Sequence, residues 1–439
     1  MHKHNLPLFL VFLLCLLGFP ALHARPLTLD EALTLAYRNN LSLQSTMVDL
    51  RGAKRDADTA WNIFLPRINA SLSHTGSTGP FISASDLTTR TNLGLSASLT
   101  VNPSVKEQME AKSLAYSIQS VTLEQGRATL KRDVTKAFYY LLMEEQNLLL
   151  QQANMDLAKK QYDEVRSKYE HAFASELELL SSQLSYEALK PSLTQAKNSY
   201  ESGLLSLKIL LGLDLEEPLL LDGEIPSTDF MLDLSMLKAY LGQNHSLALL
   251  DLNLASLENS LELQSKAALM PTLSLNGSYG ISYSNPAMPV APPSTPNKWG
   301  DYTQYSVTVA IPLDGYVKGS QTQVSLLSMQ DAIDKLLLTR LQTSRQMEQA
   351  LAVRVASLKA VVGQLELSEA NLHLTEKVFG MTMAQFSAGY VGYLEVERIQ
   401  ADLLKAKQNM LALHYQYVSA LVDLMYDLNI DTNTLAKEL

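Results

Sequence analysis

The chain has 439 residues, of which 46% are hydrophobic and 18% are charged, and this composition is typical of an ordered protein rather than a disordered one. Its formal net charge of −10 argues against a nucleic-acid-binding surface, which needs clustered positive charge. The length is enough for roughly two or three ordinary domains.

Residues 1–24 have the pattern of a cleaved signal peptide: Lys3, an apolar run from Leu8 to Leu17, and small residues ending at Ala24. The alternative is a retained anchor, but the run is only about half of the roughly 20 residues that a spanning helix needs. The single cysteine, Cys15, lies inside this segment. We therefore expect an exported chain without disulfides and without thiolate metal ligands.

The rest of the chain reads as two copies of one plan, residues 25–213 and 234–439, joined by an acidic, proline-containing linker at 214–233. Each copy has a helix, two strands, a very long helix, a short break and another long helix. The matching segments are Leu33 to Leu43 with Leu237 to Leu247, and Tyr169 to Gln183 with Phe386 to Gln400.

The first copy opens with a capping box, Thr28 to Glu31, and we expect one helix from there to about Phe64. Asn102 and Pro103 predict the start of a helix that runs to about Tyr169, roughly 100 Å at 1.5 Å per residue. Apolar residues on the long helices recur at coiled-coil spacings: Val134, Phe138, Leu141 and Leu148, and Met410, Tyr417, Leu421, Leu424 and Leu428, with Glu145 and His414 as polar exceptions.

Four segments alternate apolar and polar residues with period two, near the length that crosses a bilayer as a tilted strand: Ile68 to Ser73, Leu93 to Val101, Leu273 to Ser284, and Tyr305 to Leu313. Their polar face carries small neutral residues with no Lys, Glu or Arg, which suits a lumen, while the apolar face suits lipid. The alternative is a small soluble sheet packed on helices. Thr75 to Arg90 and Asn285 to Asp301 are expected to be loops, and Tyr279, Tyr283, Trp299, Tyr302 and Tyr305 to contribute to an aromatic belt.

Four strands cannot close a barrel, and an open sheet edge in lipid is very costly. Copies of the chain must therefore associate, giving 8 strands in a dimer or 12 in a trimer. Because a barrel of about eight strands is normally filled by side chains, the small residues of the inner face favour the trimer.

At this point the sequence resembles the TolC-like outer-membrane efflux proteins. The opening LTLDEAL at 27–33 and the doubled architecture carry the resemblance over the whole chain after residue 24. A break motif also matches, with an aromatic residue, a glycine three later, and then a leucine, an acid and a valine: Phe386, Gly389, Leu394, Glu395 and Val396.

The resemblance implies a mainly α protein with a small transmembrane β part, in which a homotrimer forms a 12-stranded β-barrel. The barrel continues as a periplasmic α-helical barrel whose tip docks on a periplasmic adaptor linked to an inner-membrane pump. The location implied is the outer membrane of a Gram-negative bacterium, in contact with its lipid. The sequence departs from the family pattern at two positions. Ala172 stands where the break motif has glycine, and Arg398 stands where some family members carry an acidic residue.

The breaks at 170–176 and 388–393 lie at the end away from the strands, where docking and closure are expected. We assign Ala172, Ser175, Gly389 and Gly392 to adaptor docking, and Tyr393, Glu395, Arg398 and Glu178 to the gate, where facing carboxylates would select cations. The alternative for Glu178 and Glu395 is helix capping.

No catalytic, cofactor or metal constellation is evident, because the five histidines after the signal peptide are scattered along the chain. We therefore expect a passive duct that exports small molecules or proteins and needs no cofactor. The competing interpretations are an exported periplasmic coiled-coil adaptor or scaffold and, last, an enzyme. The expected partners are other copies of the chain, the adaptor, the pump and outer-membrane lipid, and no nucleic acid.

Overall fold

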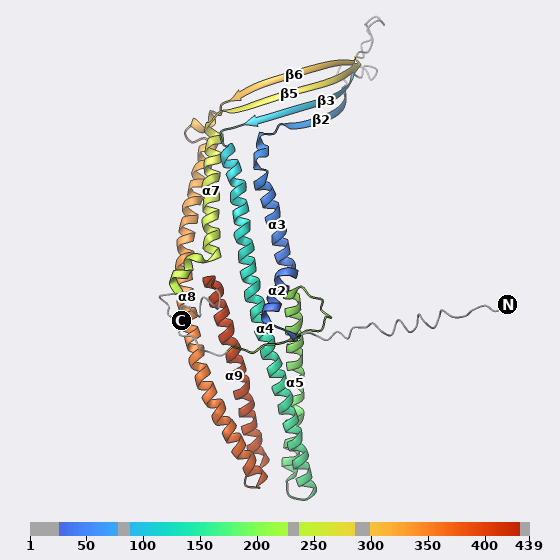
Figure 1. Cartoon of the computed structure of the whole chain (residues 1–439), viewed down its shortest axis with the longest axis vertical. Helices are drawn as coiled ribbons and strands as arrows, with labels where there is room; N and C mark the ends of the chain where they lie inside the picture. The colour runs from blue at the N-terminus through green and yellow to red at the C-terminus, as the bar shows by residue number, and fades with distance from the viewer. Residues whose placement is uncertain (1–25, 78–87, 227–236, 286–298, 431–439) are drawn as a thin grey trace, which may run out of the picture. The chain divides into compact units, whose positions relative to one another are not determined.

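The structure, a computed structural model, describes residues 26–77, 88–226, 237–285 and 299–430, so the expected signal peptide lies outside the described residues. The same order of elements occurs twice, as predicted, and the colours of Figure 1 follow it along the chain. The first copy has α3 (Leu41–Asp58), β2 (Arg67–Ser77), β3 (Thr88–Val101), α4 (Val105–Glu170) and α5 (Glu176–Leu211); the second has α7 (His245–Leu269), β5 (Thr272–Asn285), β6 (Trp299–Ala310), α8 (Gln321–Ser387) and α9 (Tyr393–Leu428).

The chain divides into two compact units, and each contains parts of both copies. One unit holds the sheet with residues 45–126 and 241–349. The other holds residues 1–44, 127–240 and 350–439, including the turns from α4 to α5 and from α8 to α9. Among the described helices, none combines the length and the hydrophobicity needed to cross a membrane.

The first unit contains a four-stranded antiparallel sheet in the order β2-β3-β5-β6. The register places Ala70, Leu95, Tyr279 and Thr303 in one row across the four strands. Because side chains alternate along a strand, this register sorts the residues into the two predicted faces. Leu95, Leu275 and Val309 share the apolar face, and Ser96, Asn276 and Thr308 share the polar face.

The strands are longer than predicted, so the two loop predictions were too wide. Residues 75–77 and 88–90 pair with each other, and β6 already begins at Trp299. Serine and threonine occur both in strands and in loops, and for this reason the strands were predicted too short. The extension places Arg67 and Arg90 on the polar face, so the expectation of a face without arginine was wrong.

Tyr302 also lies on the polar face, because it pairs with Gly280, and its placement in an apolar aromatic belt was wrong. A Cβ atom at Gly280 would stand 2.5 Å from Cζ of the Tyr302 ring. Glycine at this position therefore leaves the room in which the ring lies. The other four predicted belt residues share the apolar face, and Tyr283 and Trp299 have ring centroids 5.2 Å apart.

The predicted first helix is two helices, because it breaks at Asn40. The capping box is confirmed at the start of α2 (Leu29–Asn39), where the Glu31 backbone N–H donates to the Thr28 hydroxyl at 3.4 Å. The Asn40 side chain accepts a bond from the Leu43 N–H and donates one to the Leu210 carbonyl, both at 3.0 Å. A short 3-10 helix at Ala60–Phe64 follows α3, and α4 begins two residues later than predicted, at Val105.

The second unit has a core between its long helices. Val134, Phe138 and Leu141 of α4 are fully buried, and so are Tyr417 and Leu424 of α9. The coiled-coil rows are therefore confirmed at these positions, whereas Glu145, Leu148, Met410 and His414 are half-buried. A salt bridge between Lys136 and Asp423, at 2.9 Å, joins α4 to α9 beside this core.

Two very short strands in the same unit escaped the sequence analysis. β1 (Pro26–Leu27) pairs in parallel with β4 (Leu220–Leu221), which lies inside the expected linker 214–233. The Asp222 N–H donates to the Leu27 carbonyl at 3.0 Å and extends the pairing. This pairing holds the beginning of the first copy against the segment that follows its end.

Candidate functional site

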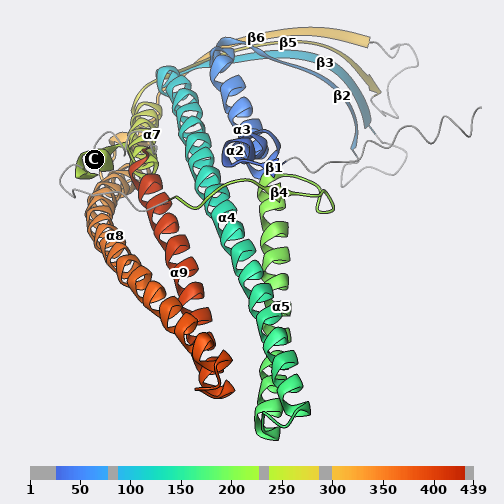
Figure 2. The same ribbon diagram turned by 60° about the horizontal axis from the view of Figure 1, so that its bottom comes forward.

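The two turns that reverse the long helices have the same backbone conformation, and Figure 2 shows both at one end of their unit. Ala172 and Gly389 have positive φ angles of 62° and 80°. The next N–H in each turn, from Phe173 and Tyr390, donates to the carbonyl of the residue five positions earlier, at 2.8 and 2.9 Å. These are Schellman motifs, which satisfy carbonyls at the ends of α4 and α8.

Glu178 belongs to the capping box at the start of α5, as the helix-capping alternative for this residue predicted. The Ser175 N–H donates to Glu178 Oε2 at 2.9 Å, and the Glu178 N–H donates to the Ser175 hydroxyl at 3.2 Å. These bonds to the Ser175 backbone and side chain, with a smaller contribution from the backbone of Tyr393, lower the pKa of the Glu178 carboxyl.

The carboxylate of Glu178 also faces the start of α9. Its Oε1 atom lies 3.5 Å from the point where a Cβ of Gly392 would stand. Gly392 is the N-cap of α9 and has no side chain to offer the exposed N–H groups of that helix. Glu178 thus serves two helix N-termini, one in each copy, and places a negative charge where both helix dipoles favour it.

Tyr393 is buried inside the protomer rather than exposed at the tip. Its side chain is only 1% exposed and packs with Val165, Phe386 and Val396. The rings of Phe386 and Tyr393 meet edge to face with centroids 6.4 Å apart. A side chain enclosed in this cluster cannot line a pore, so the structure removes Tyr393 from the predicted gate.

Glu395 and Arg398 form an ion pair within one turn of α9. Arg398 Nη2 lies 2.6 Å from Glu395 Oε1, and a second carboxylate, from Asp402, lies 3.5 Å from Arg398 Nη1. All three side chains are exposed, and Arg398 lowers the pKa of the Glu395 carboxyl. Glu395 and Arg398, two of the three charged residues predicted for the gate, therefore lie on the exposed face of α9, whereas Glu178 lies on α5.

Sequence reasoning missed two aromatic residues at the turns. Phe173 and Tyr390, which follow the residues with positive φ, are 83% and 84% exposed. In a Schellman motif the residue at this position often packs back on its own helix, but here both rings project into solvent. The sequence contains a signal for these two residues, since both copies place a large aromatic residue directly after the residue with the left-handed backbone.

The described residues contain no group of three or more His, Cys, Asp or Glu side chains that could hold a metal ion. The turns instead present a capped backbone, two apolar rings and a charged helix face.

Comparison with known proteins decides the family. The sequence matches the outer membrane efflux protein family over residues 32–213 and 236–428, which together cover most of the chain. The chain belongs to this family. Membership makes it an outer-membrane efflux duct, and the alternative of an exported adaptor or scaffold is not favoured. Among curated proteins, no sequence matches significantly.

Several solved structures of other proteins share the fold of this chain. A membrane protein from Pseudomonas aeruginosa is 17% identical with a TM-score of 0.73, over 91% of this chain and 92% of that one. The Campylobacter jejuni CmeC outer membrane channel is 16% identical with a TM-score of 0.73, over 93% and 88%. The open state of the Neisseria gonorrhoeae MtrE outer membrane channel is 15% identical with a TM-score of 0.71, over 92% and 89%.

Proposed function

We propose that three copies of this chain form one exit duct, in which their sheets join edge to edge into a closed wall. The observation that carries the proposal is the two-faced sheet, whose outer strands β2 and β6 each have one neighbour in the described chain. Its apolar face leaves Leu95, Val307 and Val309 more than half exposed. Closure satisfies the strand edges, and lipid contact covers the apolar face.

The partners proposed for the turns are a periplasmic adaptor and, through it, an inner-membrane pump. Phe173 and Tyr390 supply two exposed aromatic side chains. Aromatic residues that become buried commonly dominate the binding free energy of protein–protein interfaces. The backbone that carries these rings is shaped by the four residues assigned to docking: Ala172, Ser175, Gly389 and Gly392. The duct itself lies in the outer membrane of a Gram-negative bacterium and exports small molecules or proteins without chemistry of its own.

The gate proposed at the same end uses Glu178, Glu395 and Arg398. The Glu395–Arg398 pair is exposed to solvent, and exposed ion pairs contribute little to stability, so closure would yield to adaptor contact. The carboxylate of Glu178 helps to hold the two turns together at rest. A ring of carboxylates at this end would prefer cations.

Fractionation tests the assembly. The protein is expected in the outer-membrane fraction, soluble only with detergent, and running on gels as a trimer that dissociates on heating. A monomer recovered from the periplasm without detergent would defeat the proposal.

A further inference from the structure

The polar face of the sheet carries two arginines and no acid among the described residues. Arg67 lies opposite Ser98, and Arg90 lies opposite Thr75 and Ser284, so both share the face of Ser96. The one acidic residue in the described parts of these strands, Asp301, pairs with Ile281 and lies on the apolar face. The charge of the polar face is therefore positive in every copy.

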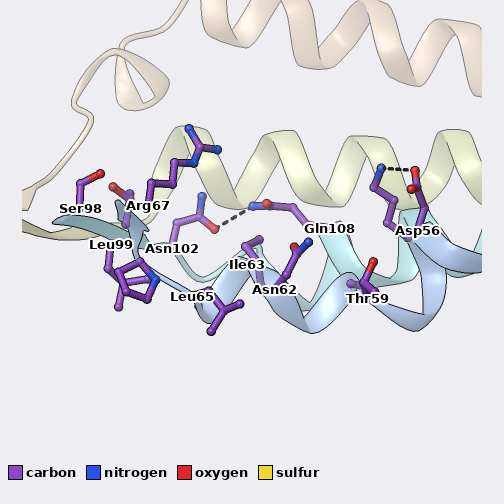
Figure 3. A pocket seen from close by; sticks show the side chains of 14 residues that line it. Asp56, Thr59, Asn62, Ile63, Leu65, Arg67, Ser98, Leu99, Asn102 and Gln108 are labelled. Atoms are coloured by element: carbon purple, nitrogen blue, oxygen red, sulfur yellow. Dashed lines mark hydrogen bonds and ion pairs between the residues drawn. The ribbon is translucent and has the colours of Figure 1, made fainter. Parts of the chain in front are cut away.

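The charges of the two arginines are not compensated within the described part of the chain. In the parts of the chain that the structure describes, neither Arg67 nor Arg90 forms an ion pair. Arg67 lines a pocket of about 790 Å³ that also contains Asp56. Asp56 is already paired with Lys112 at 3.2 Å, and Figure 3 shows it at the opposite end of the pocket from Arg67.

The two arginines mark the two ends of the polar face. Ser98, the partner of Arg67, and Arg90 are eight residues apart on β3, which is about 26 Å along the strand. With strands tilted about 35–45°, that separation corresponds to roughly 20 Å of the roughly 25 Å height of the apolar band in outer-membrane sheets. Tyr302 lies in the row midway between them, against Gly280 and Gly94.

From this arrangement we infer that the polar face of the sheet favours anions, whereas the carboxylates proposed for the gate favour cations. The cargo that the polar face favours includes small organic anions such as carboxylates, sulfonates or phosphates. The inference rests on the proposed function, because it requires three polar faces to enclose one lumen. Rings of arginine side chains favour anions in pores. The guanidinium groups near both ends of a face without acidic residues in the described strands would attract an anion into the duct and along it.

Ion selectivity in planar bilayers tests the inference. The purified trimer is placed in a KCl gradient, and the zero-current potential gives the ratio of chloride to potassium permeability. Replacing both residues, Arg67→Gln with Arg90→Gln, is expected to lower this ratio at least about twofold at 0.1 M salt. The difference should shrink at 1 M, where the Debye length is only about 3 Å.

Three further variants isolate the cause. Arg67→Lys with Arg90→Lys retains the charge and should keep the wild-type ratio. Ser96→Asp adds an acid to the same face and should lower the ratio even if the glutamine variant assembles poorly. Asp301→Asn removes a charge from the apolar face and should leave the ratio unchanged. The charges at the helix turns are identical in all of them.

A conducting trimer whose ratio is moved by neither the glutamine variant nor Ser96→Asp would overturn the inference and leave the export duct standing. A rise of similar size in Asp301→Asn would overturn it as well, because the effect of charge would then not depend on the face. A wild-type trimer that does not conduct counts against the proposed duct itself.

Discussion

Ala172 and Gly389 occupy the same left-handed position in the two turns, with φ angles of 62° and 80°. Left-handed backbone costs alanine about 1–2 kcal/mol, but it costs glycine almost nothing. The first copy therefore carries strain at its turn that the second copy avoids.

The first prediction exchanges these two residues. Ala172→Gly should stabilise the protein by about 0.5–1 kcal/mol per copy, and Gly389→Ala should destabilise it by about 1 kcal/mol. A Cβ at Gly389 meets no atom within 4 Å, so the second variant isolates the backbone effect. Thermal unfolding of the detergent-solubilised protein measures both changes, and shifts of the same sign would refute the interpretation.

The second prediction concerns pH at Glu178. Because the folded state lowers the pKa of this carboxyl from its ordinary value of 4.5, its stabilisation is complete above that value and is lost as the pH falls below it. Glu178→Gln should cost about 1 kcal/mol near neutral pH, as the loss of a cap does, and should reduce the loss of thermal stability on acidification. Glu176→Gln in the same turn is the control, since Glu176 does not belong to the capping box. Equal pH profiles for wild type and Glu178→Gln would contradict the assignment.

The third prediction concerns resting closure. Arg398→Ala removes the ion pair to Glu395 and should raise the resting conductance of single channels, while Glu395→Gln should weaken cation preference at the tip. Lys405→Ala, further along α9, is a suitable charge control. Wild-type traces from both tip variants would place the gate elsewhere.

The fourth prediction concerns docking. Phe173→Ala together with Tyr390→Ala removes both exposed rings and should reduce adaptor binding by tenfold or more, about 1.4 kcal/mol. Trimer formation should be unaffected, because the rings touch little of their own chain. Leu184→Ala on α5, also exposed, serves as a control away from the turns. Unchanged adaptor affinity in the double variant would argue against a contact at these rings.

The fifth prediction separates the two faces of the sheet. Leu95→Arg puts a charge on the apolar face at the middle of β3 and should cost about 2–4 kcal/mol per copy. Ser96→Arg, one residue along on the polar face, should be tolerated. The yield of heat-sensitive trimer measures the difference, and equal damage would indicate a sheet that faces water on both sides.

The sequence predicted the features that are encoded locally. Alternation over seven or more residues defines a strand and both of its faces, so Leu95 and Ser96 were placed correctly. The capping boxes at Thr28 and Ser175 were also visible, since their partners lie three residues away.

Features that depend on distant partners were missed. The break at Asn40 is stabilised by a bond to a carbonyl 170 residues away. Tyr393 was placed at the gate because it is a bulky residue directly after the break at Gly392, but packing between α4, α8 and α9 encloses it. The strands β1 and β4 have two residues each, which is too short for any periodic pattern.

The pairing of Leu27 with Leu221 has a consequence for how such a chain could have arisen. It brings the beginning of the first copy beside the segment that follows its last helix. When the two ends of a module are neighbours in space, a second copy can follow the first directly. The linker between the copies can then stay short, because the second copy begins close to the place where the first one began. The gene could therefore have doubled in one step, and the same adjacency makes the segment around residue 222 a natural point at which to cut the chain into two co-expressed halves.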